Sequence, residues 1–377
     1  MVSRSRDPLP ILDHAFPAAG NALWLPDRQL WLADPEAARG VLANEDGLYE
    51  EHSDFFYTRH GPVGPRSAQV AIGRRARELL LDHLKERSAA IPAAVADVGP
   101  ERDWPDAGNW LVYRHLEGAL IAPGTPLGFR RLVERVVERA VLAGARERQS
   151  RARRAFFRFQ VALGLEREID RRQRGRRTPV DLLDAVLEGA APGTPAPELG
   201  EVYLSCVFAV AGSVGFTLAW SLFLLGTHPP TEADPEQVVR EALRLWPIAW
   251  MLGRRPVRPH TVAGVAVTPD DLVVASPYLV HRHPEHWEEP RVFRPERWTA
   301  PWSTKAYIPF GWGPHTCVAA ALSLQLVARI LGVILERYRL SLTCQEPRPQ
   351  VGPALAPPRF VLRLDPRRPG AQHKERR

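Results

Sequence analysis

The chain has 377 residues, 45% of them hydrophobic and 25% charged, a composition typical of a globular protein. Part of the formal net charge of +7 lies in residues 367–377. A basic chain end of this kind is typical of a solvated tail, so the charge does not indicate nucleic-acid binding. We expect one domain over residues 1–365 and a disordered basic tail over residues 366–377.

The cysteines and the first residues argue against a disulfide-rich, a zinc-binding and a secreted protein. Cys206, Cys317 and Cys344 have unrelated spacings, which fit neither a disulfide framework nor a zinc site and indicate a reducing, cytoplasmic setting. The stretch Met-Val-Ser-Arg-Ser-Arg-Asp-Pro contains no apolar run, so we expect no signal peptide and no membrane anchor there.

The hydrophobic pattern predicts a mainly helical chain with small sheets. Strands are expected at residues 24–26 and 29–32, and helices at residues 35–44, 67–87, 110–121, 129–141, 151–172, 179–187 and from 196 onward.

The segment 202–225 contains no charged residue and is long enough to span a membrane. It is a single segment, and it holds Ser205, Gly212, Ser213 and Gly215. A helix that is apolar on every side is also typical of the centre of a large globule. We therefore expect a buried central helix and no membrane.

Two charged motifs follow this segment. Glu241 and Arg244 share one face of a predicted helix, where they can pair bidentately. The same spacing recurs at Glu168 and Arg171, so by itself it indicates an ordinary surface ion pair. The second motif is Phe-Arg-Pro-Glu-Arg-Trp at residues 293–298, which contains Arg297.

The most informative motif is Phe-Gly-Trp-Gly-Pro-His-Thr-Cys at residues 310–317. A cysteine thiolate that binds iron needs ionisation, shelter from water and nearby backbone N–H groups. Gly311 and Gly313 allow a close backbone approach, and the helix-forming run 318–328 is expected to place Cys317 at a helix N-terminus, where the dipole favours an anion. The alternative is that Cys317 is only a small buried side chain.

This loop resembles the haem-binding loop of the cytochrome P450 superfamily. Phe310, Gly313, His315 and Cys317 fill its four characteristic positions, while Ala319 replaces the usual glycine two residues after the cysteine. The resemblance, specific from about residue 241 to 342, implies the soluble bacterial type of fold, with a long central I helix over a buried haem b. It also implies that residues 241–244 belong to the K helix.

The resemblance assigns structural and haem-binding roles. It implies a buried cluster of Glu241, Arg244 and Arg297 that braces the proximal side of the haem. One arginine after the K helix is expected to bind a haem propionate, with Arg255 the first choice and Arg254 the second. A second propionate ligand, Arg77, is expected on a C helix over residues 67–87. The similar pattern at residues 110–114 leaves too little room before the I helix.

The I helix departs from the family on the distal side. Ala211 and Gly212 match its Ala-Gly landmark, but Val214 and Gly215 stand where relatives carry an acid and a threonine that relay protons. The catalytic residues are therefore unknown. Either the substrate orders the relay, or peroxide replaces dioxygen, or the reaction is a desaturation or an oxidative coupling.

The resemblance also implies a substrate pocket. Residues 129–141 and 151–172 are expected to form the F and G helices of its roof, and a hydrophobic or aromatic small molecule, a secondary metabolite, is expected inside. The expected lining is equally compatible with core packing and consists of Phe208, Ala211, Val214, Gly215, Trp250, Met251 and Leu252.

The implied function is a monooxygenase that uses dioxygen and NAD(P)H electrons delivered by ferredoxin reductase and ferredoxin. A monomer in the cytoplasm is expected. The short interval 227–235 implies a compact variant with a shortened J region, and a haem-binding protein without turnover remains the alternative.

Overall fold

The computed structural model describes residues 7–51, 53, 55–59, 61–142, 150–175, 178–299 and 304–367. The chain forms two compact units. The first contains residues 1–52, 230–317 and 349–356, and the second contains residues 53–229, 318–348 and 357–377. The expected single domain stays a prediction.

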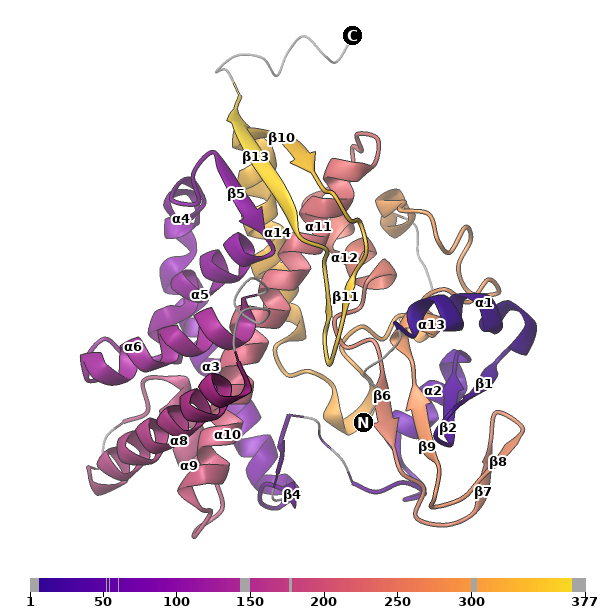
Figure 1. Ribbon diagram of the computed structural model, residues 1–377, viewed down its shortest axis with the longest axis horizontal. Coiled ribbons are helices and arrows are strands. Elements are labelled where there is room, and N and C mark those ends of the chain that lie inside the picture. The colour runs from indigo at the N-terminus through magenta and orange to yellow at the C-terminus, as the bar shows by residue number, and fades with distance from the viewer. Residues whose placement is uncertain are drawn as a thin grey trace. The chain divides into compact units, whose positions relative to one another are not determined.

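The first unit is built on a four-stranded sheet of order β1-β2-β9-β6 (Figure 1), in which β2 and β9 are parallel and the other neighbours are antiparallel. Its elements are α1 (Leu9–Ala19), β1 (Ala22–Leu25), β2 (Gln29–Leu32), α2 (Pro35–Ala43), α12 (Pro235–Leu245), β6 (Leu252–Arg254), β7 (His260–Val262), β8 (Val265–Val267), β9 (Leu272–Ala275), α13 (Pro277–Val280), the 3₁₀ turns η4 (Pro295–Thr299), η5 (Thr304–Ala306) and η6 (Gly313–His315), β11 (Gln350–Val351) and β12 (Leu355–Ala356).

Capping residues explain where two of its helices begin. Asp34 accepts a hydrogen bond from the backbone of Ala37 at 2.7 Å and starts α2. Asp234 and Gln237 form a reciprocal capping box that starts α12. The interval between Thr227 and Pro235 contains no helix, as the sequence predicted.

The second unit is mainly helical and carries a small antiparallel sheet of order β10-β13-β5. Its elements are β3 (Tyr57–Thr58), β4 (Gly61–Pro62), α3 (Arg66–Arg87), the 3₁₀ turn η1 (Ser88–Ala90), α4 (Ile91–Ala96), β5 (Glu101–Trp104), α5 (Asp106–Leu120), α6 (Leu127–Val136), the π-helical turn η2 (Val137–Val141), α8 (Arg151–Arg174), α9 (Leu182–Gly189), α10 (Ala196–Val207), the π-helical segment η3 (Phe208–Val214), α11 (Gly215–Thr227), α14 (Ala320–Arg337), β10 (Tyr338–Thr343) and β13 (Phe360–Pro366).

The predicted central helix is one continuous run, Ala196–Thr227, made of α10, η3 and α11 (Figure 1). It has the length and apolar composition of a membrane span, but 83% of its most apolar window is buried inside the protein. The burial identifies it as a core helix.

The predicted helices and strands are present, with boundaries shifted by a few residues, and α1 was not predicted. Pro366 ends β13, and the N–H of Arg367 donates to the carbonyl of Arg337 at 2.8 Å, so the predicted tail is ordered at its first two residues. Residues 368–377 lie outside the described part of the chain.

Candidate functional site

The cysteine loop is closed at its two ends by one hydrogen bond. The N–H of Cys317 donates to the carbonyl of Phe310 at 3.0 Å. Between them, Gly311 and Gly313 have φ values of 74° and 72°, which are strained for any residue with a side chain. The two glycines therefore set the course of the loop.

The loop rests on the C-terminal end of α2. A Cβ added to Gly313 would lie 2.7 Å from the Cα of Ala43, and the guanidinium of Arg39 stacks 5.1 Å from the ring centroid of Trp312. The close approach made by Gly313 is thus to α2. The Cys317 side chain is exposed, and the helix predicted from residue 318 begins at Ala320.

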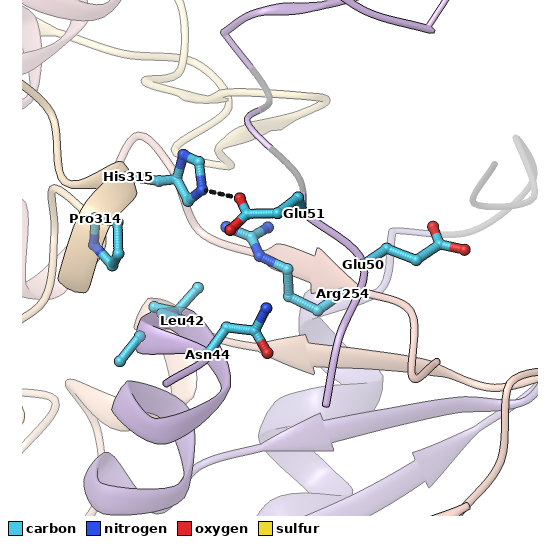
Figure 2. Close-up of a pocket in the computed structure, with 8 residues that line it drawn as sticks. Leu42, Asn44, Glu50, Glu51, Arg254, Pro314 and His315 are labelled. Atoms are coloured by element: carbon cyan, nitrogen blue, oxygen red, sulfur yellow. Dashed lines mark hydrogen bonds and ion pairs between the residues drawn. The ribbon is translucent and has the colours of Figure 1, made fainter. Parts of the chain in front are cut away.

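A small pocket lies beside the loop (Figure 2). Arg254, the last residue of β6, is only 5% exposed and lines this pocket together with Pro314 and His315. The neighbouring Arg255 is exposed, because successive strand residues point to opposite faces. The first-choice propionate ligand, Arg255, therefore lies outside the pocket, and the second choice, Arg254, lies inside it.

The pocket already receives one carboxylate. The Nε2 of His315 lies 3.0 Å from an Oε atom of Glu51, and Figure 2 shows the Arg254 guanidinium directed toward this pair. The Glu51 side chain is 75% exposed, so another carboxylate can displace it from His315. The guanidinium and imidazole of this pocket, together with the exposed thiol at the end of the same loop, fit a haem, which has carboxylates at its edge and an iron centre.

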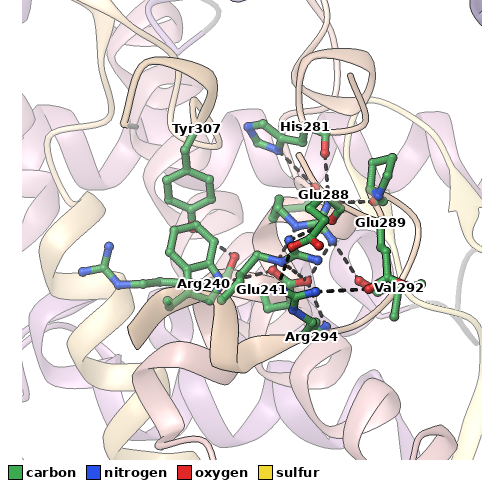
Figure 3. A network of polar contacts seen from close by, with 12 residues as sticks. Arg240, Glu241, His281, Glu288, Glu289, Val292, Arg294 and Tyr307 are labelled. Atoms are coloured by element: carbon green, nitrogen blue, oxygen red, sulfur yellow. Dashed lines mark hydrogen bonds and ion pairs between the residues drawn. The ribbon is translucent and has the colours of Figure 1, made fainter. Parts of the chain in front are cut away.

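The structure brings the three predicted network residues together, and Figure 3 shows Glu241 within this network of polar contacts. Arg244 binds the two carboxylate oxygens of Glu241 at 2.9 and 2.8 Å, and both side chains are fully buried. The Nε of Arg297 donates to Glu241 at 3.0 Å, and the indole of Trp298 donates at 3.0 Å. Both oxygens of the Glu241 carboxylate therefore accept hydrogen bonds, which is the condition for a buried carboxylate to be tolerated.

His281 connects this network to the cysteine loop, a role the sequence analysis did not assign. Its Nδ1 bonds the carbonyl of Arg244 at 3.1 Å, and its Nε2 accepts from the N–H of Ile308 at 2.9 Å. Burial and the nearby Arg244 hold the pKa of His281 well below its usual value, so the ring is neutral and can accept at Nε2. Its partners lie 37 and 27 residues away in the sequence, so no local pattern marks this role.

The central helix is distorted where the Ala-Gly landmark lies. Ala211 and Gly212 fall in the π-helical segment η3, and the buried side-chain amide of Asn109 on α5 donates to their carbonyls at 2.6 and 3.2 Å. A π-helical turn frees carbonyl groups from the normal ladder, and Asn109 satisfies two of them. Sequence analysis missed Asn109, whose partners are about a hundred residues away.

The predicted substrate face is not one face. Phe208 is 39% exposed, whereas Ala211 is fully buried, Val214 is 9% exposed and Gly215 packs directly against Asn109. The prediction assumed 3.6 residues per turn, and η3 has a wider turn, which rotates these positions away from one another.

Trp250, predicted to line the substrate pocket, packs in a hydrophobic core. Its ring lies in the core of the first unit, 5.6 Å from that of Trp31, and its Nε1 donates to the carbonyl of Gly352 at 2.8 Å. Met251 packs against the same core, and Leu252 packs against a second cluster. The pocket roles of these three residues stay predictions.

Arg77 is exposed on α3, one helical turn after Gly73. A Cβ added to Gly73 would lie 3.2 Å from Val318, the residue that follows Cys317. The haem-binding roles of Arg77, Ala211 and Gly212 stay predictions.

Comparison with known proteins matches part of the chain to one family. A family model described as cytochrome P450 matches residues 236–363. Cyclooctat-9-en-7-ol 5-monooxygenase of Streptomyces melanosporofaciens is 31% identical over 204 residues, which are 46% of this chain and 44% of that protein. Pentalenene oxygenase of Streptomyces avermitilis is 28% identical over half of each chain. The chain thus matches about half the length of these curated relatives.

Solved structures extend the likeness of the fold to almost the whole chain. CYP175A1 from Thermus thermophilus has a TM-score of 0.71 and 24% identity and covers 95% of both chains. A post-tailoring hydroxylase of himastatin biosynthesis, HmtN, has a TM-score of 0.74 and 16% identity, covering 94% of this chain and 96% of that one. Residues 236–363 thus match the cytochrome P450 family, and the chain has the mainly helical fold with small sheets of the solved cytochrome P450 structures.

Proposed function

We propose that this protein is a haem-thiolate monooxygenase that oxidises a hydrophobic secondary metabolite. The observation that carries the proposal is the exposed Cys317 at the end of a glycine-shaped loop, next to the pocket of Arg254 and His315. Two matched relatives are named for the oxidation of cyclooctat-9-en-7-ol and of pentalenene, so a terpenoid-like molecule is the proposed substrate class.

Different residues of the first unit would bind different parts of the cofactor. The Sγ of Cys317 would hold the iron of haem b, and Arg254 and His315 would bind a propionate. The Glu241 network and His281 fix the segment before the loop, so the thiol is held on a rigid base. When bound, the haem supplies dioxygen activation with electrons from NAD(P)H, passed on by ferredoxin reductase and ferredoxin in the cytoplasm.

The proton supply is unusual in this chain. Val214 and Gly215 hold no exchangeable side-chain proton, and Ser213 is the only polar side chain of η3. Ser213 is half-buried, while the Oγ of Thr217 already donates to the carbonyl of Ser213 at 2.9 Å. We propose that the Ser213 hydroxyl is the side-chain group of η3 that supplies a proton for the reaction.

A spectroscopic experiment tests the cofactor assignment. The reduced protein treated with carbon monoxide should show the red-shifted Soret band of thiolate ligation, and Cys317→Ser should lose it. Cys344→Ser is the matched control because Cys344 directly follows β10 in the second unit and should keep the band. A band that survives Cys317→Ser contradicts the proposal.

A turnover experiment tests the reaction. With a ferredoxin system and a terpenoid substrate, we expect product formation coupled to NADPH consumption. Ser213→Ala should lower product per NADPH by roughly tenfold or more, whereas Ser205→Ala, whose hydroxyl bonds the carbonyl of Glu201 at 3.1 Å, should not. Val214 and Gly215 occupy the positions where an acid and a threonine are expected, so desaturation, oxidative coupling or peroxide use is the second candidate reaction. Haem binding without any turnover would favour a non-catalytic role.

A further inference from the structure

The first half of α8 presents an apolar stripe to solvent. Phe156 and Phe159 are 62% and 64% exposed, the highest values for large hydrophobic side chains in the part of the chain that the structure describes. They lie three residues apart on the helix and therefore side by side.

This stripe lies opposite the face by which α8 is buried. Within residues 151–165 the buried side chains are those of Phe157, Val161 and Leu165, spaced by four along one face. At 3.6 residues per turn the opposite face contains Phe156 and Phe159 with Ala152 and Ala155 before them. We call these four residues the α8 stripe.

Arginines border the α8 stripe on both sides. Helical geometry puts Arg151 and Arg158 along one edge and Arg153 along the other, and all three are exposed. Residues 150–165 contain no acidic side chain, and Glu166 is the first. The stripe is thus an apolar surface within a positively charged frame.

The helix that carries the stripe is firmly anchored. Arg139 stacks 4.8 Å from the ring of Phe157 on the buried side. At the other end of α8, the guanidinium of Arg172 is 1% exposed and bonds Glu168 and Asp184 at 2.7 and 2.8 Å. Because these contacts fix α8 (Figure 1) in the second unit, the exposure of the two phenylalanines is a property of the folded unit.

We propose that the α8 stripe docks on an anionic membrane surface. Aromatic rings on one face with flanking arginines are the features by which a helix lies in the lipid interface, the rings entering it and the arginines meeting lipid phosphates. Charge decides the occupant: a second copy of this chain would bring the same arginines into contact with the first set, which is repulsive. The inference does not depend on the proposed reaction.

Vesicle flotation of the purified full chain tests the proposal. The protein should float with vesicles of phosphatidylglycerol and phosphatidylcholine and not with phosphatidylcholine alone, and added salt should weaken the binding. Phe156→Ser with Phe159→Ser should lower the bound fraction at least tenfold. Arg151→Gln with Arg158→Gln should lower the partition coefficient by about fivefold per arginine.

A matched control lies in the first unit. Val257 is 50% exposed and stands next to the exposed Arg258, so Val257→Ser with Arg258→Gln removes the same kinds of group and should leave flotation unchanged. Unaltered thermal midpoints in all variants show that folding is retained. No flotation with anionic vesicles overturns the proposal, as does equal loss in the control. Gel filtration that shows a dimer lost with the phenylalanines, without vesicle binding, assigns the stripe to self-association instead.

Discussion

At the scale of single residues, the contact between Gly215 and Asn109 determines what the central helix can carry. A Cβ on Gly215 would lie 2.5 Å from the Nδ2 and 2.7 Å from the Cα of Asn109. Backbone atoms cannot move away as a flexible side chain can. The threonine that relatives carry at this position therefore has no room here, and its absence is part of the way α5 packs on α11.

This contact predicts the effect of one added methyl group. Gly215→Ala should lower the free energy of unfolding by roughly 1–3 kcal/mol through overpacking. Gly212→Ala is the control, because its Cβ would meet Val141 at an ordinary 3.7 Å and alanine is the better helix former by about 1 kcal/mol. Denaturant unfolding of both variants checks this. Equal effects would show that the contact with Asn109 imposes no constraint.

The accuracy of the sequence predictions at this scale depended on how local the determining contacts are. The loop of Phe310 and Cys317 could be predicted because its glycines and its closing hydrogen bond lie within eight residues. The choice between Arg254 and Arg255 could not be made, since a strand register shifted by one residue exchanges the two faces. The core contacts of Trp250 could not be predicted either, because its partners, Trp31 and Gly352, are far away in the sequence.

At the scale of elements, the junction of α8 and α9 depends on one buried arginine. The guanidinium of Arg172 bonds Asp181, the N-cap of α9, at 2.5 and 3.0 Å, and it also bonds Asp184 and Glu168. Sequence analysis treated the neighbouring pair of Glu168 and Arg171 as an ordinary surface contact. The structure shows instead that Glu168 is buried and belongs to this cluster.

Removal of this arginine should be far more damaging than removal of its neighbour. Arg172→Met removes the cation that Asp181, Asp184 and Glu168 share and leaves Glu168 its contact with Arg171, which should cost about 3–5 kcal/mol. Arg171→Met, at a side chain that is 47% exposed, should cost about 1 kcal/mol or less. Comparison of the two unfolding free energies checks the prediction. Similar losses would mean that the cluster is maintained without Arg172.

The element boundaries show the same limit of sequence reasoning. Hydrophobic periodicity predicted the helices, because each buries one face against its own unit. It could not predict the π-helical turn of η3, since that turn depends on the amide of Asn109 and no local pattern marks it. The helix itself was predicted, but the geometry assumed for the face through Phe208 and Val214 was that of a regular α-helix.

At the scale of the whole molecule, each unit keeps a neutral histidine inside. In the first unit, burial and Arg244 lower the pKa of His281 well below 6.5, and burial also lowers that of His283. In the second unit, burial, with His83 and Arg87 nearby, lowers the pKa of His115 to about 4. All three rings are protonated more readily in the unfolded chain than in the folded one.

The sign of the pH dependence follows from this difference. Above pH 6.5 these histidines are neutral in both states, and they contribute their full stability. As the pH falls below 6.5 the unfolded chain takes up protons that the folded chain refuses, so stability declines, and for His115 the decline ends near pH 4. Each histidine should contribute about 1.4 kcal/mol of lost stability per pH unit within its interval.

One substitution isolates the contribution of the second unit. His115→Gln removes a single titrating ring, so the slope of unfolding free energy against pH between about pH 6 and 5 should fall by about 1.4 kcal/mol per pH unit relative to the original chain. Denaturant unfolding at several pH values, followed by a probe of each unit, gives this slope. His281 and His283 remain in place and supply the reference, because the part of the slope that belongs to the first unit should not change. A slope that stays the same would mean that His115 is already protonated in the folded protein, and a buried cation of that kind would require a carboxylate partner that the ring does not contact among the described residues.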